Sequence, residues 1–262
     1  MQNIIEKLHT IRSHAGTAQT VGLNDETIVA FAAKDPALVA AVDAAIQAHN
    51  TLKDDFADAL SLDEEALSAQ LQKDYVNFYP ASHINPYVAL AAAGPWMITA
   101  HGAVLHDSGG YGMLGLGHAP AEVIETMAQP WVMANIMTPS FAQARLATRL
   151  QKEVGHTRGA CPFDRFLCIN SGSESVTVAA RITDINALQQ TAPGARHEGK
   201  EIAFLGLRGA FHGRTGRPAQ VSHSTTPTYK KNLASFASRD NLYIVEINDC
   251  DSLQAAFDQA EV

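Results

Sequence analysis

Apolar and polar positions alternate in blocks along the second half of the chain, where short apolar runs separate longer segments of helical spacing. The pattern predicts strands over 164–170, 201–207 and 241–247, and helices over 141–154, 174–189 and from 251 onward. Strands and helices in alternation favour an open, mostly parallel α/β sheet. In such a sheet, ligands bind at the carboxyl ends of the strands.

The first 74 residues are acidic and rich in alanine, with apolar residues at helical spacing. Ala37–Ala48 has this spacing, and Ser61-Leu62-Asp63-Glu64 has the capping-box pattern that predicts a helix over Glu65–Lys73. This region carries no catalytic signature. We predict that residues 1–74 form a helical N-terminal extension that packs on the body of the protein or on a partner subunit.

The next segment, up to Pro95, is rich in proline, asparagine and aromatic residues, which are typical of an irregular linker. Short strands are predicted over Trp96–Val104 and a helix over Pro120–Ala128. The predicted division of the chain is a helical extension (1–74), a segment that contributes to a small domain and a dimer interface (75–140), and the first part of a large domain (141–262).

Composition and charge narrow the class of protein. The chain has 262 residues, 46% of them hydrophobic, which is ample for a folded core. A net charge of −8 does not favour binding to nucleic acid or to anionic membranes. The start of the chain has no continuous apolar core, so neither a signal peptide nor a membrane helix is expected. Cys168 lies inside a predicted strand, where we expect a reduced thiol in the core. Because a reduced thiol indicates a reducing compartment, we predict a cytoplasmic protein.

The apolar run of the first predicted strand stops at Asn170-Ser171-Gly172-Ser173, where a helical pattern begins. Small residues let backbone N–H groups approach an anion, the two serine hydroxyls add donors, and a helix N-terminus is partly positive. The spacing therefore suits a phosphate cradle. An ordinary strand-turn-helix junction capped by Ser173 has the same letters.

A second motif follows the next predicted strand, where Arg208-Gly209-Ala210-Phe211-His212-Gly213-Arg214-Thr215-Gly216 crowds three glycines around an aromatic ring and an arginine. Glycine permits close backbone approach, so Phe211 can present a flat wall and Arg214 a fork for a carboxylate. A loop with a packed phenylalanine and a solvated arginine is the alternative.

Three motifs in this order resemble the class III pyridoxal-phosphate-dependent aminotransferases, the ornithine and lysine ω-aminotransferase group. They are HGAVLHDSGGYGMLGLGHAP, NSGSES and GAFHGRTG, and the resemblance covers roughly residues 85–262. It implies fold type I, a mostly parallel sheet with flanking helices. It also implies pyridoxal 5'-phosphate as cofactor, an amino acid and a keto acid such as 2-oxoglutarate as substrates, and a homodimer.

The resemblance also implies roles for individual residues. Ser171, Gly172 and Ser173 would hold the cofactor phosphate, Phe211 would stack on the pyridine ring, and His212 would shape the pocket.

Two further positions correspond to substrate contacts. Arg214 would grip the α-carboxylate, and Tyr111 falls near a substrate-facing aromatic of the ornithine group. A carboxylate clamped at a distance points the terminal amine at the cofactor, which favours an ω-amino donor.

The resemblance stops short of a complete catalytic centre. The family's Asp-Glu-x-Gln-x-Gly segment and Schiff-base lysine are not matched, so we assign no catalytic residue and expect the lysine beyond Val262. Lys200, Lys230 and Lys231 stand in polar surroundings and are predicted to be solvated. The alternative to an aminotransferase is a non-catalytic or truncated fragment that acts through protein partners.

Three histidines, His101, His106 and His118, lie close together in sequence. Their spacing is not a standard ligand pattern, and no metal site is predicted.

Overall fold

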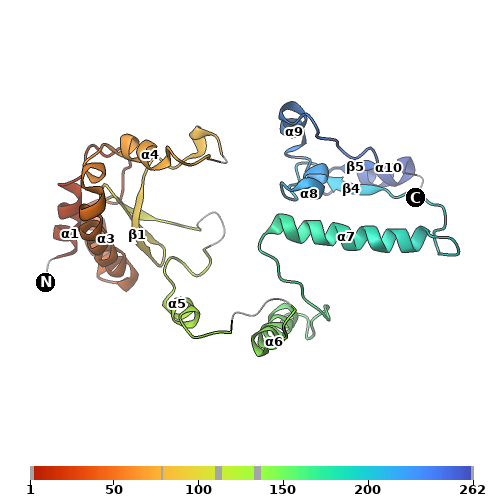
Figure 1. Cartoon of the computed structure of the whole chain (residues 1–262), viewed down its shortest axis with the longest axis horizontal. Coiled ribbons are helices and arrows are strands. Elements are labelled where there is room, and N and C mark those ends of the chain that lie inside the picture. Colours follow the sequence, from red (N-terminus) through yellow and green to blue (C-terminus); the bar gives the residue numbers. More distant parts are fainter. Residues whose placement is uncertain (1–2, 78, 110–113, 133–136, 261–262) are drawn as a thin grey trace. The chain divides into compact units, whose positions relative to one another are not determined.

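The computed structural model describes residues 3–77, 79–109, 114–132 and 137–260 (Figure 1). The chain divides into two compact units, the N-terminal unit Met1–Met133 and the C-terminal unit Ala134–Val262. Each has its own helices and its own small sheet. No helix in the described part of the chain combines the length and apolarity that a membrane crossing requires.

Within the described residues, the N-terminal unit combines five α-helices with a small antiparallel sheet of strand order β1-β2-β3. Trp96 of β2 pairs with Ala93 of β1 and with His106 of β3, which fixes the register of the three strands. The elements are α1 (Ile4–Arg12), α2 (Asp25–Ala32), α3 (Pro36–Leu60), α4 (Glu64–Gln72), the 3-10 turn η1 (Ala81–His83), β1 (Ala89–Ala93), β2 (Trp96–Thr99), β3 (Val104–His106) and α5 (Ala121–Met127).

Helix α3 is the centre of this unit because one of its faces packs on the sheet. Its fully buried residues recur every three or four positions, which puts them on one side of the helix. Trp96 is 2% exposed, and its Nε1 donates a 2.6 Å hydrogen bond to Asp35 Oδ2 at the start of α3. The core that results joins the first helices to the sheet and contains Leu8, Ile11, Ile28, Leu38, Ala41, Val42, Ala45, Trp96, Ile98 and Val104.

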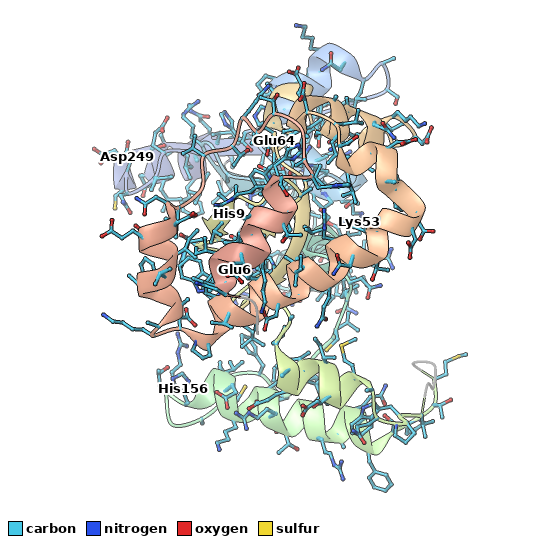
Figure 2. The ribbon with its side chains drawn as sticks, turned by 90° about the vertical axis from the view of Figure 1, so that its left-hand side faces the viewer. Glu6, His9, Lys53, Glu64, His156 and Asp249 are labelled. Atoms are coloured by element: carbon cyan, nitrogen blue, oxygen red, sulfur yellow. The ribbon has the colours of Figure 1, made fainter. Side chains whose placement is uncertain are left out.

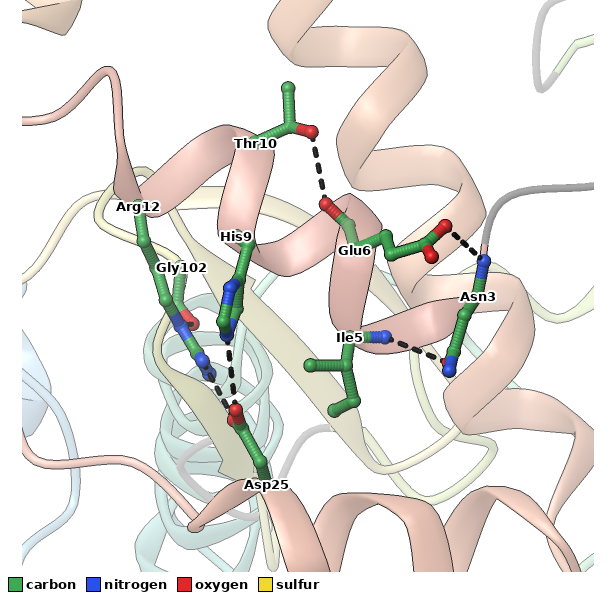
Figure 3. A network of polar contacts seen from close by, with 8 residues as sticks. All are labelled: Asn3, Ile5, Glu6, His9, Thr10, Arg12, Asp25 and Gly102. Carbon is green, nitrogen blue, oxygen red and sulfur yellow. Dashed lines mark hydrogen bonds and ion pairs between the residues drawn. The ribbon is translucent and has the colours of Figure 1, made fainter.

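Polar contacts fasten α1 to the elements around it (Figure 3). Asn3 caps the helix by accepting from Ile5 N at 3.2 Å, while Asn3 N donates to the Glu6 carboxylate at 2.9 Å. At the other end, Arg12 Nε donates to the Gly102 carbonyl at 3.1 Å and a terminal guanidinium nitrogen of Arg12 binds Asp25 Oδ1 at 2.7 Å. This contact with Arg12 lowers the pKa of Asp25.

The loop between α1 and α2 is held by carboxylates at the start of α4. Glu64, labelled in Figure 2, is fully buried. Its Oε2 accepts from Thr20 N at 2.6 Å. Asp63 Oδ1 accepts from Thr17 N at 2.7 Å, and this hydrogen bond lowers the pKa of Asp63. The predicted capping box at Ser61 does not form, because the N-cap of α4 is Asp63 and its carboxylate is committed to Thr17.

The C-terminal unit contains the parallel pairing that the alternating pattern predicts. Strands β4 and β5 pair in parallel from Phe204↔Leu242 to Leu207↔Val245. The elements are α6 (Phe141–Gly155), α7 (Gly172–Thr191), β4 (Phe204–Leu207), α8 (Gly216–Val221), α9 (Thr226–Asn232), β5 (Leu242–Val245) and α10 (Cys250–Gln259).

One predicted strand is wrong. Residues 164–170 have no strand structure, and no strand among the residues that the structure describes pairs with them. A strand is held by hydrogen bonds to a neighbouring strand, so an apolar run without such a neighbour does not form a strand. Leu167 is accordingly 60% exposed, and Cys168, predicted as a core thiol, is also exposed.

Candidate functional site

The start of α7 places the first motif at a helix N-terminus. Ser171 is the N-cap, and its Oγ accepts from Glu174 N at 3.2 Å and donates to the Glu174 carboxylate at 3.1 Å. Gly172 and Ser173 occupy the first two helical positions, where backbone N–H groups have no carbonyl of their own helix to bind. The hydroxyl of Ser171 therefore serves the cap, and the donors aimed outward come from the two residues after it.

The second motif lies directly against this helix start. Arg214 N donates to Ser173 Oγ at 3.1 Å, and Thr215 Oγ1 donates to the Ser173 carbonyl at 3.4 Å. The hydroxyls of Thr215 and Thr177 also lie 3.1 Å apart, one turn further along α7. Two motifs about forty residues apart in sequence thus form one surface.

Gly213 allows this close approach. Its φ is +118°, a backbone conformation that residues with a Cβ rarely adopt. A Cβ added there would lie 2.5 Å from Ser173 Oγ and 2.9 Å from Ser173 Cα. A side chain at this position would push the loop away from the helix.

A serine further along the chain holds the loop from behind. Ser222 is fully buried, and its Oγ accepts from His212 N at 2.9 Å. The same hydroxyl lies 3.1 Å from the Gly213 carbonyl and 2.9 Å from the Pro218 carbonyl, to which it donates.

Two residues beside this serine continue the attachment. His223 Nδ1 accepts from Gly209 N at 3.0 Å, and Ser224 Oγ donates to the Ala210 carbonyl at 3.1 Å. Sequence reasoning missed Ser222, His223 and Ser224. The signal that could have found them is a run of small polar residues shortly after a glycine-rich loop that needs hydrogen-bond partners for its backbone.

Phe211 and Arg214 lie on the open side of the loop. The Phe211 side chain is 54% exposed, and Arg214 Cζ lies 5.8 Å from the centroid of its ring. This distance is within the range of a cation–π contact. His212, between them, is half-buried. The loop therefore presents a planar ring and a guanidinium side by side.

The upstream motif belongs to the N-terminal unit. There His118 Nε2 lies 3.0 Å from Asp107 Oδ2, and His106 Nδ1 lies 3.3 Å from Ser108 Oγ. Tyr111, predicted to face the substrate, lies outside the described residues. Among the residues that are described, no three histidine, cysteine or acidic side chains are grouped so that they could hold a metal ion.

A family model described as aminotransferase class-III matches residues 78–260. The chain belongs to the class III aminotransferase family. The cofactor of class III aminotransferases is pyridoxal phosphate. A search of curated proteins gives no match.

Two solved structures of ornithine aminotransferase from Toxoplasma gondii are similar to this class III chain. One is 18% identical and covers 80% of this chain and 45% of its own, with a TM-score of 0.57. The other is 17% identical and covers 79% of this chain and 46% of its own, also with a TM-score of 0.57. At this identity the likeness shows the fold, α/β of fold type I. The chain spans less than half the length of these proteins.

The start of α7 fits the phosphate of the family's cofactor. Gly172 and Ser173 each offer an N–H group, and a phosphate here meets the positive end of the helix dipole. Ser173 Oγ already accepts from Arg214 N, so its own proton remains to be donated to an anion. Nothing lies within 4 Å of a Cβ built on Gly172, so an anion has room to approach the backbone.

The three lysines that the sequence predicts to be solvated, Lys200, Lys230 and Lys231, are all exposed.

Proposed function

We propose that the chain is the N-terminal portion of a pyridoxal-phosphate-dependent aminotransferase and that the junction of α7 with the 209–215 loop binds the cofactor. The single observation that carries this proposal is the hydrogen bond from Arg214 N to Ser173 Oγ. This hydrogen bond holds the phosphate-cradle motif beside the motif that contains Phe211 and Arg214. A ligand with both a phosphate and an aromatic ring needs the two motifs at one place. Family membership supports the same reaction class.

The residues of the junction divide the binding task. Gly172 and Ser173 donate to the phosphate from backbone N–H groups and one hydroxyl, and Ser171 fixes the helix start that aims them. Phe211 offers its exposed ring as a wall for the pyridine, and His212 shapes the pocket beside it. Bound pyridoxal phosphate would supply the electron sink for moving an amino group from an amino acid to a keto acid such as 2-oxoglutarate.

Arg214 is proposed to bind the α-carboxylate of the donor, with Tyr111 as a second substrate contact. A guanidinium pairs with a carboxylate through two parallel hydrogen bonds. Such a clamp orients the donor so that its terminal amine is presented, which favours an ornithine-like or lysine-like ω-amino substrate. The position of Arg214 beside the ring of Phe211 supports this assignment.

The proposed enzyme has the predicted division into an extension (1–74), a small-domain segment (75–140) and a large-domain segment (141–262), and it acts as a cytoplasmic homodimer. Exposed apolar side chains along α7 support the proposal that further protein packs on this helix, since Ile182 and Leu188 are 61% and 69% exposed. The Schiff-base lysine is proposed to lie beyond Val262.

The first test measures binding, since it needs no turnover. The chain is titrated with pyridoxal phosphate and with pyridoxal, which lacks the phosphate. A phosphate held by a helix N-terminus and three donors predicts an affinity at least about a hundredfold higher for the phosphorylated compound. Equal affinities contradict the proposal and favour the alternative, a non-catalytic fragment that acts through protein partners.

The second test addresses the donor in an active form of the enzyme. Arg214→Gln should lower kcat/KM for an ω-amino acid by roughly a hundredfold, because a bidentate charged contact is lost. An amine without a carboxylate should react equally well with both enzymes. A variant that loses activity on both donors would contradict the carboxylate role of Arg214.

A further inference from the structure

Ser222 stands at the centre of the contacts that shape the 209–215 loop. Its side chain is fully buried, and it ends helix α8 as the C-cap. The hydroxyl oxygen accepts from His212 N at 2.9 Å and lies 3.1 Å from the Gly213 carbonyl. One hydroxyl thus contacts the backbone of both His212 and Gly213.

The backbone that Ser222 holds leads directly to the helix start. Gly213 is buried and lies against Ser173, and the next residue, Arg214, donates its N–H to Ser173 Oγ. Any movement of the backbone at His212 and Gly213 therefore moves the donor that orients the Ser173 hydroxyl. The hydroxyl of Ser222 therefore influences the position of the Ser173 hydroxyl through the backbone of His212, Gly213 and Arg214.

We propose that Ser222 is a positioning residue of the cofactor site, which fixes the loop so that the hydroxyl proton of Ser173 is directed at the phosphate. This inference rests on the proposed function, because it assigns the phosphate as the group that Ser173 meets. It extends the site to a buried residue that touches neither cofactor nor substrate. Ser222 contributes no chemistry of its own.

The physical reason is the cost of leaving a partly buried backbone group without a partner. Without the hydroxyl of Ser222, His212 N loses its acceptor, and an unpaired N–H that is partly shielded from water is unfavourable. Outward movement of the loop gives that N–H fuller access to water. Outward movement separates Arg214 N from Ser173 Oγ.

The experiment compares three variants in the full 262-residue chain. Ser222→Ala removes the hydroxyl, and Ser222→Cys keeps a side chain of similar size with a weak donor and acceptor. Ser235→Ala is the matched control, because Ser235 is exposed. Each protein is titrated with pyridoxal phosphate and with pyridoxal, and amide hydrogen exchange is followed over residues 209–215.

We expect Ser222→Ala to weaken binding of pyridoxal phosphate by about tenfold, the usual effect of one lost buried hydrogen bond. Binding of pyridoxal should weaken less than binding of pyridoxal phosphate, because pyridoxal has no phosphate to meet Ser173 and is affected only through the ring of Phe211. Ser222→Cys should fall between Ser222→Ala and the unchanged chain, and Ser235→Ala should match the unchanged chain. The amides of His212 and Arg214 should exchange faster in Ser222→Ala, while those of α10 keep their rates.

Other results separate the possible failures. If the unchanged chain binds both compounds equally, the proposed function fails and the inference fails with it. If the chain prefers the phosphorylated compound and Ser222→Ala keeps that preference undiminished, only the inference fails. If Ser222→Ala accelerates exchange throughout the unit, including α10, and Ser222→Cys binds pyridoxal phosphate no better, Ser222 has a general structural role and the inference is overturned.

Discussion

The backbone N–H of Arg214 donates a 3.1 Å hydrogen bond to the hydroxyl oxygen of Ser173, 41 residues earlier in the chain. Because this contact occupies the acceptor side of the hydroxyl, the hydroxyl proton points elsewhere. The helix N-terminus beside it is the place where a negative charge is most favoured. The hydrogen bond therefore sets both the spacing of two motifs and the direction of one donor.

Ser173→Ala should weaken binding of pyridoxal phosphate by about ten- to hundredfold, since a hydrogen bond to a charged group is lost and Arg214 N loses its acceptor. The measurement is a titration followed by absorbance or calorimetry. Ser175→Ala is the matched control, because the Ser175 hydroxyl donates to the Ser171 carbonyl within α7. Equal losses in both variants would mean that the effect comes from the helix and not from the site.

Gly213→Ala should reduce cofactor binding strongly, by at least about tenfold, and lower stability by about 1–3 kcal/mol. The added Cβ meets Ser173 and the residue keeps its φ of +118°. Gly199→Ala separates these two causes. Gly199 also has a positive φ, +74°, but nothing lies within 4 Å of a Cβ there. It should lose stability without losing affinity for pyridoxal phosphate.

Ser171→Ala should affect the helix more than the ligand. Loss of an N-cap costs about 1 kcal/mol, so the first turn of α7 should exchange its amide hydrogens several-fold faster. Affinity for pyridoxal phosphate should fall less than in Ser173→Ala, because the Ser171 hydroxyl is committed to Glu174. Ser171→Thr, which keeps the capping oxygen, should behave like the unchanged chain. A larger loss of affinity in Ser171→Ala than in Ser173→Ala would reverse the roles of the two serines.

The sequence was sufficient to predict the elements that carry the site. The helix after Ser171 and the parallel pairing of the two later strands follow from the spacing of apolar positions, although no residue of α7 is itself buried. Small residues and glycines at the ends of apolar runs identify the two motifs. These are local signals, so one chain suffices to find them.

The contacts that complete the site could not be predicted in this way. Ser222 reaches His212 through a turn of the backbone after α8, and no spacing rule encodes that distance. The strand wrongly predicted over 164–170 has a different explanation. Its apolar composition is that of a strand, but a strand also needs a neighbour, and pairing is a property of the whole sheet.

The stability of the N-terminal unit should decrease as the pH falls below about 6.5, the ordinary pKa of histidine. His49 is 1% exposed, and burial lowers its pKa, with electrostatic interactions with Lys53 and His14 adding to the effect. His49 therefore binds a proton more weakly in the folded state than in the unfolded state. The free energy of unfolding is therefore unaffected by this histidine above about pH 6.5, where His49 is neutral in both states. It decreases as the pH falls from there through the lowered pKa of His49.

Denaturant unfolding at about pH 8 and about pH 5, on either side of the ordinary histidine pKa, checks this prediction. One histidine changes the slope by at most about 1.4 kcal/mol per pH unit. His49→Met should flatten the dependence below neutral pH, whereas His83→Met should not, since His83 is exposed. An unchanged pH dependence in His49→Met would show that His49 is not the titrating group.

Two adjacent residues of α3 test whether the first helices and the sheet share one core. Leu38 is fully buried in the cluster that contains Trp96, whereas Val39 is 37% exposed. Leu38→Ala should lower the free energy of unfolding of the N-terminal unit by about 2–5 kcal/mol, because it removes buried methyl groups and leaves a cavity. Val39→Ala should cost less than about 1 kcal/mol. Unfolding is followed by tryptophan fluorescence, since Trp96 is buried in the same cluster. If both variants unfold at the same denaturant concentration, the first helices do not cover the sheet as the structure has them.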